Sequence, residues 1–480
     1  MRYSGFLTLM SLWLAEDSQA SAAMSTTNLL SILSRGNWST GTVLSAPGST
    51  DFTDATARWD VYRPPNYAAA LSIHSEQDLI TAVKLSTANN ISFLATGGRH
   101  GYSITFGNLQ NGLALDLSPL DTVAVDAAAG TLTIGPGVTF GDVMDPVYEA
   151  GYQIQTGTCT CVEMIGATIG GGIGRLQGTY GLVIDGLLSA RVVTAAGEVL
   201  EVSENFNADL FWGIRGAGAN LGILTSATYQ LHPLTGNYTS IDLIFPASRN
   251  VTYFTALENF NTSAHWAIET EILYNADING PEIIASYVYE GDQEEALKLL
   301  APILDVGPSF INVTEVPWNE LSAIAAFATD AEVCENGSIY DIYGVNLRTL
   351  TAATWIETEG QSSSVVFESW ANEAVVAVAD EKTAYPWRDT TTYVMLQFVW
   401  STSDSSVEAP SIAMAQKVRD TLIETSGYDD LAVYVNYANG DEALEEMYGA
   451  RKLPRLAELK KKYDPSNVFR YSNPLPTAYS

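Results

Sequence analysis

The sequence predicts an α+β protein of two domains, in which the second domain is an antiparallel sheet covered by helices. Three observations predict this class. The chain has 480 residues, which suits two domains of ordinary size, and its 46% hydrophobic content is enough for two cores. Strand-like and helix-like segments are short and closely spaced up to residue 231. After Pro233 strand-like runs are mixed with helices, as in a separate antiparallel domain.

The expected first domain spans residues 61–237 and follows a polar, turn-rich N-terminal arm at 23–60. Residues 71–75 alternate like a strand, 76–89 have helical spacing, and the strand at 91–96 runs directly into two glycines. The later elements expected here are strands at 112–117, 123–127 and 131–134, a helix at 139–150 ended by Gly151, a hairpin of 186–194 with 199–202, and a strand at 221–231.

The expected second domain spans residues 238–428, and a C-terminal segment follows at 429–480. Its strand-like runs are 240–245, 283–289 and 393–398, and its helical runs are 294–304 and 411–425. The C-terminal segment is expected to hold a short strand at 434–437 and a helix at 441–462. In a strand, Tyr434 and Asn436 share one face and Tyr437 lies on the other.

The net charge and the N-terminal sequence indicate which binding partners and which cellular compartment to expect. With 55 acidic against 23 basic residues, the net charge of −32 argues against binding to nucleic acid or to an anionic membrane surface. Residues 1–22 have the form of a signal peptide: Arg2, an apolar run over 6–15, and Ala20-Ser21-Ala22 as the cleavage site. The alternative is an ordinary N-terminal helix. We therefore expect a secreted, N-glycosylated monomer, with sequons at Asn37, Asn90, Asn237, Asn250, Asn261, Asn312 and Asn336.

The loop Gly97-Gly98-Arg99-His100-Gly101 follows a predicted strand and is suited to binding a pyrophosphate. Consecutive glycines allow several backbone N–H groups to point at one anion. No G-x-G-x-x-G opens a helix here, so a nicotinamide cofactor has no support. The alternative interpretation is a plain tight turn with a hydrogen-bonded His.

A second glycine-rich segment begins at Gly157 and contains Cys159 and Cys161. Its glycines are costly to order, and close backbone approach to a ligand is the usual reason for them. Cys159-x-Cys161 lacks the further Cys or His ligands of a zinc site and the spacing of a C-x-x-C redox motif, so we expect no metal. With Cys334, the two cysteines leave either a disulfide or buried thiols as alternatives.

These segments resemble the berberine bridge enzyme-like flavoprotein oxidases of the vanillyl-alcohol oxidase superfamily, in their fungal form. The resemblance spans most of the chain: Pro64-Pro65, 75–78, 97–102, 157–181, 215–222, 434–437 and 463–469. It implies a two-domain PCMH-type FAD-binding fold. Residues 61–237 would bind FAD, 238–428 would bind substrate, and 429–480 would return to the FAD domain.

The resemblance also implies FAD bound covalently at two points. His100 would bond the flavin 8α-methyl carbon and Cys159 would bond C6. Counting back eleven residues from Gly170 favours Cys159 over Cys161. Two departures are Arg99, between the glycines and His100, and Ile173, where relatives often have His. The further FAD contacts implied are Thr96, Gly97, Gly98, Arg99, Gly101, Gly157, Val162, Gly166, Gly170, Gly171, Gly174, Tyr180, Gly222, Ile223 and Asn436.

Tyr434 is the first choice for the catalytic base, because in relatives a Tyr of this motif faces the substrate. Tyr437 is expected to line the flavin or the core, and Tyr102 is a weaker candidate. A phenol is a poor base unless a cation or hydrogen bonds favour its ionised form. The relatives' substrate-domain Glu has no matching motif here.

The resemblance implies an oxidase that removes a proton from a small organic substrate, passes hydride to flavin N5 and reduces dioxygen to hydrogen peroxide. A small side chain at Val162 would leave dioxygen a path to the flavin. The expected substrate is a phenolic or polyketide intermediate of secondary metabolism. The alternatives are a sugar or oligosaccharide oxidase, a non-redox cyclase on the same fold, and a secreted flavin-binding protein without turnover.

Overall fold

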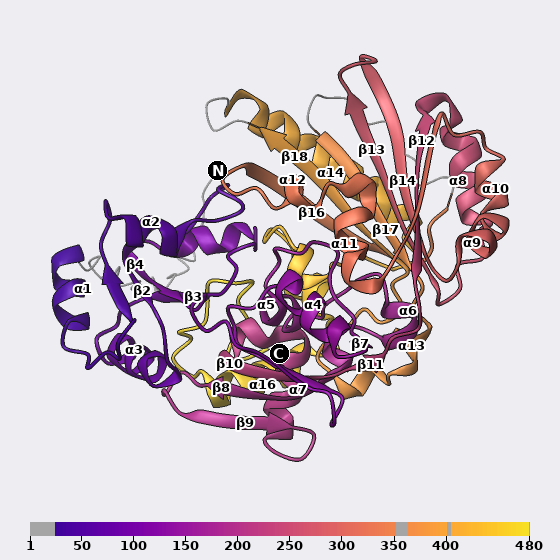
Figure 1. Ribbon diagram of the computed structural model, residues 1–480. Helices are drawn as coiled ribbons and strands as arrows, with labels where there is room; N and C mark the ends of the chain where they lie inside the picture. Colours follow the sequence, from indigo (N-terminus) through magenta and orange to yellow (C-terminus); the bar gives the residue numbers. More distant parts are fainter. Residues whose placement is uncertain (1–24, 352–362, 401–404, 480) are drawn as a thin grey trace, which may run out of the picture.

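A computed structural model describes residues 25–351, 363–400 and 405–479 (Figure 1). It confirms the predicted class: helices are mixed with largely antiparallel sheets, in two lobes. The first lobe contains residues 25–233 and the second contains residues 238–425 within the described ranges. The C-terminal segment, drawn in yellow, runs through the middle of the molecule (Figure 1). The predicted signal peptide lies outside the described residues.

The first sheet has the order β1-β2-β4-β3, and β2, β4 and β3 are parallel. Its strands are β1 (Val43–Ser45), β2 (Tyr67–Ser72), β3 (Phe93–Thr96) and β4 (Gly112–Asp116), and its helices are α1 (Thr26–Leu33), α2 (Thr50–Thr56) and α3 (Glu76–Ala88). The segment expected as a polar arm supplies α1, β1 and α2. It joins the sheet because β1 pairs with β2 and because Leu29 and Leu33, one helical turn apart, are buried.

The second sheet is antiparallel and has the order β5-β6-β10-β8-β9. Its strands are β5 (Val123–Asp126), β6 (Thr131–Ile134), β8 (Leu187–Val193), β9 (Val199–Ser203) and β10 (Ile223–Gln230). The helices of this part are α4 (Phe140–Glu149), α5 (Met164–Thr168), α6 (Gln177–Tyr180) and α7 (Ala208–Ala217), and β7 (Tyr152–Gln153) pairs with β11 (His232–Pro233). The helix α4 begins at a Thr139–Asp142 capping box and ends before Gly151, whose φ of +85° suits glycine.

The third sheet forms the second lobe, with seven strands in the order β15-β12-β14-β13-β17-β18-β16. They are β12 (Tyr238–Pro246), β13 (Trp266–Asn275), β14 (Gly280–Glu290), β15 (Phe310–Val316), β16 (Ile339–Leu347), β17 (Ser363–Trp370) and β18 (Thr392–Trp400). Its helices are α8 (Asn250–Glu258), α9 (Gln293–Leu299), α10 (Ala301–Leu304), α11 (Leu321–Ile324), α12 (Asp330–Val333), α13 (Glu373–Ala377) and α14 (Glu408–Thr425). Figure 1 shows α8, α9 and α10 beside the β12 end of this sheet.

Four predicted elements differ from the structure. The strand expected at 71–75 lies earlier, as β2, because Ser75 is already the N-cap of α3 and its hydroxyl accepts from the Asp78 N–H. The helix expected at 294–304 is divided into α9 and α10, because Pro302 has no N–H for an unbroken helix. The helix expected at 441–462 is divided into α15 (Leu444–Tyr448) and α16 (Leu453–Tyr463), with Gly449 at φ +70° between them. The strand expected at 434–437 is wrong: Val435–Tyr437 is a turn of 3-10 helix, closed by the Tyr437 N–H donating to the Tyr434 carbonyl.

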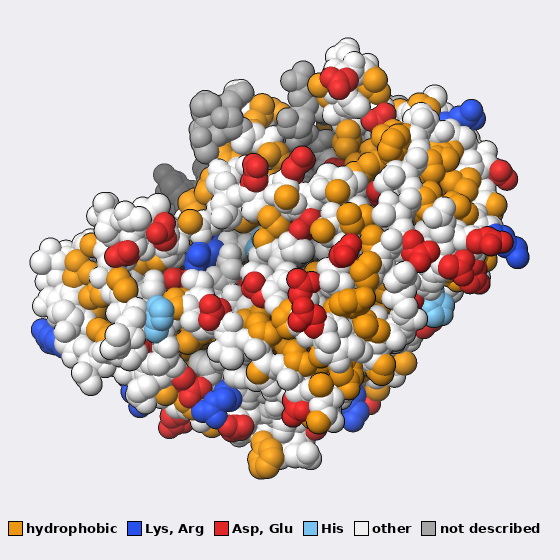
Figure 2. Space-filling model, in the orientation of Figure 1, with side chains coloured by type: hydrophobic (Ala, Val, Ile, Leu, Met, Phe, Trp, Pro, Cys, Tyr) orange, Lys and Arg blue, Asp and Glu red, His pale blue; other side chains and the backbone are white. Residues whose placement is uncertain are grey.

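The C-terminal segment packs on the first lobe through a buried ammonium. Lys460 is fully buried and donates to the backbone carbonyls of Asn220 and Phe469 and to the Asp464 carboxylate. A buried charge is tolerated when it is paired and hydrogen-bonded in this way. Acidic side chains are spread over the visible face of both lobes (Figure 2). In the described ranges no helix is both long and apolar enough to cross a membrane.

Candidate active site

A cavity of about 510 Å³ lies between the two lobes. The first lobe contributes the loops that begin at Thr96 and Gly157, and the second contributes β13, β17 and β18. Most of the predicted site residues line it: Thr96, Gly97, Gly98, Arg99, His100, Gly101, Tyr102, Gly157, Cys159, Val162, Gly166, Gly170, Gly222, Ile223, Tyr434, Asn436 and Tyr437. Gly171, Gly174 and Tyr180 do not.

The loop after β3 approaches neighbouring backbone so closely that glycine is required. A Cβ on Gly97 would lie 2.0 Å from the Pro136 carbonyl oxygen, and one on Gly98 would lie 2.7 Å from Cβ of Glu163. Arg99 adopts the left-handed conformation, with φ +57°. Its guanidinium is held by a 2.6 Å bond to the buried Asp116 carboxylate and a 2.8 Å bond to the Ala57 carbonyl. The departure at Arg99 is therefore accommodated by a fixed turn that leads directly into His100.

The His100 ring is held by stacking. Its centroid is 4.2 Å from that of Trp59, and Trp59 stacks in turn on Tyr340 at 4.0 Å. Burial, with a smaller contribution from the Arg58 charge, lowers the pKa of His100 to about 4, so the imidazole is neutral at physiological pH. Its Nε2 atom is buried and has no hydrogen-bond partner among the described residues. A neutral ring with an unpartnered nitrogen fits a nucleophile facing a bound group.

Cys159 is a free thiol in a loop fixed to the second lobe. Cys161, two residues later, forms a disulfide with Cys334 at the end of α12. The Thr160 N–H also donates to Asp330, at 2.9 Å. Burial raises the pKa of Cys159 to about 12, so the thiol is protonated in the protein as it stands. The structure thus resolves the open alternative for the cysteines in favour of a Cys161–Cys334 disulfide.

Removing this disulfide is expected to destabilise the protein without removing Cys159. The cysteines are separated by 173 residues in sequence, and loop-closure entropy sets an upper limit of about 5 kcal/mol for such a crosslink. We expect Cys161→Ser with Cys334→Ser to lower the free energy of unfolding by about 2–5 kcal/mol in urea titrations. Because one bond is lost in every case, the single and double variants should give the same loss. A double variant that unfolds at the wild-type urea concentration would contradict the assignment.

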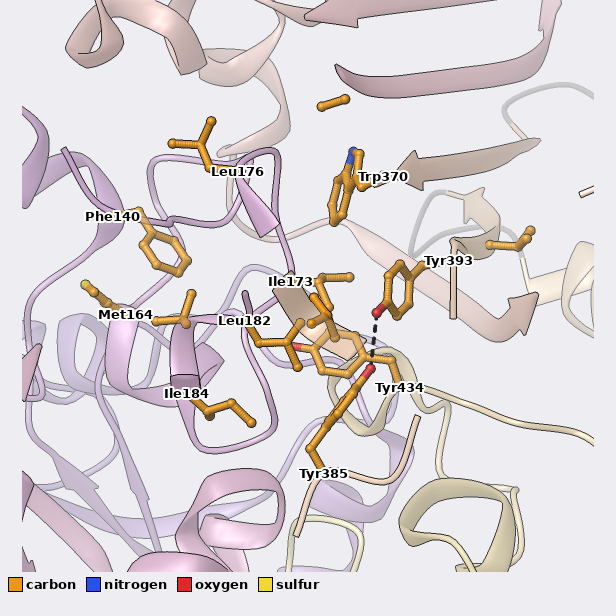
Figure 3. Packing of buried hydrophobic residues seen from close by; sticks show 14 of the residues in the cluster. Phe140, Met164, Ile173, Leu176, Leu182, Ile184, Trp370, Tyr385, Tyr393 and Tyr434 are labelled. Atoms are coloured by element: carbon orange, nitrogen blue, oxygen red, sulfur yellow. Dashed lines mark hydrogen bonds between the residues drawn. The ribbon is translucent and has the colours of Figure 1, made fainter. Parts of the chain in front are cut away.

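The glycines of the second segment are in contact with the C-terminal motif at 434–437. A Cβ on Gly170 would lie 2.0 Å from Oδ1 of Asn436. The Tyr434 hydroxyl accepts from the Gly172 N–H at 2.9 Å and from the Asn436 amide at 2.7 Å. Figure 3 shows Tyr434 packed with Tyr385 and Tyr393 beside Ile173. Burial raises the pKa of Tyr434 well above its usual range, so this phenol serves to hold the glycine loop.

The three predicted contacts that do not line the cavity lie against other protein groups. A Cβ on Gly171 would lie 3.0 Å from the rings of Tyr385 and Tyr434, and one on Gly174 would lie 1.9 Å from the Thr156 carbonyl oxygen. Tyr180 stacks on His232 at 4.0 Å. Gly166 does line the cavity, but its N–H donates to the carboxylate of Glu163, whose pKa burial raises to about 8.

Tyr437 faces a carboxyl group that the sequence did not reveal. Its hydroxyl donates to Oε2 of Glu368 on β17 at 2.8 Å, and both side chains line the cavity. In the 3-10 turn Tyr434 and Tyr437 therefore line the same cavity, where a strand would have separated them. Burial raises the pKa of Glu368, and the neighbouring Glu269 carboxylate raises it further. The Tyr102 hydroxyl is buried at the same cavity without a partner among the described residues.

Other lining residues were also missed, and they come from segments that carry no motif. Trp59 lies in the segment predicted as an arm, and Glu269 and Trp370 lie on strands β13 and β17, which the sequence did not predict. One pattern in the sequence could have indicated Glu368: it is the only charged residue in the apolar run Val365-Val-Phe-Glu-Ser-Trp370. The neutral His100, with its unpartnered ring nitrogen, and a cavity lined by both glycine-rich loops fit a flavin dinucleotide in contact with both loops.

Comparison with known proteins agrees with this site. The family model described as "FAD binding domain" matches residues 67–203, and "Berberine and berberine like" matches residues 433–476. FAD-linked oxidoreductase srdI of Neurospora crassa is 51% identical over 451 residues, covering 91% of this chain and 90% of its own. FAD-linked oxidoreductase OXR1 of Pyricularia oryzae is 49% identical, covering 95% and 93%.

Solved structures share the fold. Physcomitrella patens BBE-like 1 superposes with a TM-score of 0.84 at 20% identity, covering 94% of this chain and all of its own. Glucooligosaccharide oxidase from Acremonium strictum, which has a 6-S-cysteinyl, 8α-N1-histidyl FAD, superposes with a TM-score of 0.80 at 21% identity, covering 94% of this chain and all of its own. With the fungal relatives above, these matches show that the chain belongs to the berberine bridge enzyme-like family and is an FAD-linked oxidoreductase.

Proposed function

We propose that this oxidoreductase is a secreted oxidase that takes a proton and a hydride from a small hydroxylated substrate, with dioxygen as the final acceptor. FAD, when bound, supplies the hydride acceptor and the site at which dioxygen becomes hydrogen peroxide. The observation that carries the proposal is the hydrogen bond from Tyr437 to Glu368, inside a cavity that His100 and Cys159 also line.

The Glu368–Tyr437 pair is the proposed base, in place of Tyr434. The Tyr434 hydroxyl already accepts two hydrogen bonds, whereas the Tyr437 proton points at a carboxylate. Tyr437 can take the proton of a substrate hydroxyl while it passes its own proton to Glu368. A carboxyl whose pKa is raised by burial is a suitable acceptor, because a base works best when its pKa is near the operating pH.

His100 and Cys159 are proposed to hold the cofactor by two covalent bonds. The 8α-N1-histidyl, 6-S-cysteinyl FAD named for the Acremonium strictum oxidase supports this assignment, as does the neutral imidazole. The remaining predicted cavity residues, from Thr96 to Asn436, are proposed as non-covalent contacts. Val162 lies three residues after Cys159 and is proposed to leave space for dioxygen.

Phenolic or polyketide compounds are the proposed substrates, because the cavity has a largely aromatic and apolar wall. That wall consists of Trp59, Tyr340, Ile342, Val366, Trp370 and Met395. Oxidation of a sugar is the second candidate. Glu269, Glu271 and Gln397 favour it, since several hydrogen-bonding groups on one wall suit a polyhydroxylated ligand.

Secretion is supported by the disulfide and by the exposure of the sequons. Disulfides persist in oxidising compartments. Six of the sequon asparagines are exposed and Asn250 is half-buried. We propose an N-glycosylated monomer, which deglycosylation and light scattering would test.

The deciding experiment is substrate oxidation by the purified holoenzyme. Phenolic benzyl alcohols and oligosaccharides would be compared for peroxide release in air and for loss of flavin colour under anaerobic conditions. The proposal predicts both signals with the phenolic set, and the second candidate predicts them with the sugars. Anaerobic conversion of a substrate without loss of flavin colour would indicate a non-redox cyclase and contradict the oxidase.

A further inference from the structure

A row of polar side chains crosses the third sheet beside the cavity. Directly paired residues of antiparallel strands point to the same face. Successive pairings connect one residue from each of the seven strands, in the order Asn312, Asp242, Ser286, Glu269, Glu368, Tyr393 and Asn346. The row therefore places a line of hydrogen-bonding and acidic groups on the face that carries the proposed base.

Within this row two carboxyl groups are direct neighbours. Glu269 on β13 pairs with Glu368 on β17, and both line the cavity. Like charges directly opposite each other destabilise a sheet, so a pair of this kind at a cavity requires a reason. The cation at this pair is Arg175, whose guanidinium lies 3.7 Å from Oε2 of Glu269. Arg175 thus forms an ion pair with Glu269, so the two carboxyl groups have different surroundings.

We propose that Glu269 is a positioning residue for the base: its carboxylate, paired with the Arg175 guanidinium, lies opposite Glu368 and repels negative charge there, so that a proton is favoured on the Glu368–Tyr437 pair. The inference rests on the proposed function, because it assigns Glu269 a role through Glu368. In the reaction Tyr437 takes the proton of the substrate hydroxyl and passes its own proton to Glu368, and bound FAD would supply the acceptor for the hydride.

The electrostatic surroundings agree with this asymmetry. Burial raises the pKa of Glu368 most, the Glu269 carboxylate raises it further, and the Tyr437 hydrogen bond and Arg175 oppose this. For Glu269, burial also raises the pKa, and the charge of Arg175 lowers it. The other titratable groups around the pair are Asp242, Glu271, Tyr393, Tyr434, Tyr102 and Cys159. None of these is a cation, and Arg175 lies beside Glu269, so its charge favours ionisation of Glu269 over Glu368.

The test is the pH dependence of holoenzyme in which Glu269 is changed to Gln. Removing the neighbouring charge should lower the proton affinity of Glu368, so the acid limb of kcat/KM should move about one to two pH units towards lower pH. The conservative variant Glu269→Asp keeps the charge and should restore the limb. Glu282→Gln is the matched control: it lies on the neighbouring strand β14, pairs with Leu273 and does not line the cavity, so it should leave the limb in place.

A second readout does not depend on turnover. The component of the infrared carbonyl band that Glu368→Gln removes from the wild-type spectrum belongs to the Glu368 carboxylic acid. This component should titrate in the wild type and should titrate at lower pH in Glu269→Gln. If Glu269→Gln slows the enzyme equally at all pH values and leaves the band unmoved, Glu269 is structural and the inference is overturned. If no substrate reduces the flavin, the proposed function fails, while the infrared titration still tests the carboxyl pair.

Discussion

Replacing Glu368 by Gln is expected to lower kcat about 10²–10⁴-fold, the usual contribution of a positioned acid or base. The amide oxygen can still accept the hydrogen bond that Tyr437 now donates to the carboxylate at 2.8 Å. The side chain therefore keeps its shape and its partner but cannot bind the transferred proton. The measurement is stopped-flow reduction of the flavin under anaerobic conditions, which isolates the step in which substrate loses its proton and hydride.

Two tyrosine variants make this test specific. Tyr437→Phe should also slow flavin reduction, because the relay to Glu368 is lost. Tyr434→Phe should retain flavin reduction and instead reduce thermal stability, because its hydroxyl holds the Gly172 N–H and the Asn436 amide. The assignment is contradicted if Glu368→Gln reduces its flavin at the wild-type rate, or if Tyr434→Phe is the variant that loses it.

The two loops that line the cavity could be predicted because each is marked by a local sequence pattern. His100 and Cys159 each lie within a few residues of several glycines, and Gly97 and Gly170 are in close contact with Pro136 and Asn436 of the protein itself. Glu368 could not be predicted in the same way. Its partner Tyr437 is 69 residues away in sequence, and the register that places it opposite Glu269 is set by strands without motifs.

The fold shows the same division between local and distant causes. The strand at Thr131–Ile134 was predicted with its observed bounds because its pattern alternates and its neighbours are turns. Residues 434–437 are too few for periodicity to separate a strand from a 3-10 turn, and contact with the glycines near Gly170 decides between them. The Cys161–Cys334 bond likewise depends on which segments of the two lobes meet.

The second prediction concerns the covalent bonds to the cofactor. The wild-type protein, denatured in acid, is expected to remain yellow, and His100→Ala and Cys159→Ala should each remain yellow through the other bond. The double variant His100→Ala with Cys159→Ala should release all of its flavin. Peptide mass mapping identifies the attached residue in each case. Flavin on the Cys161 peptide, or colour that stays with the double variant, would contradict the assignment.

The order in which the two bonds form should depend on pH, because the two nucleophiles differ in protonation state. His100 has a pKa of about 4 and is neutral across the physiological range, whereas the thiol of Cys159, with a pKa of about 12, must lose its proton to become a nucleophile. When apoprotein is mixed with FAD, attachment through His100 should proceed at one rate between about pH 6 and pH 8. Attachment through Cys159, followed in the His100→Ala variant, should become faster as the pH rises. If the two attachment rates show the same pH dependence, a neighbouring group removes the Cys159 proton. The carboxylates to replace would then be Glu269, Asp330 and Glu368, because their charges act on the thiol.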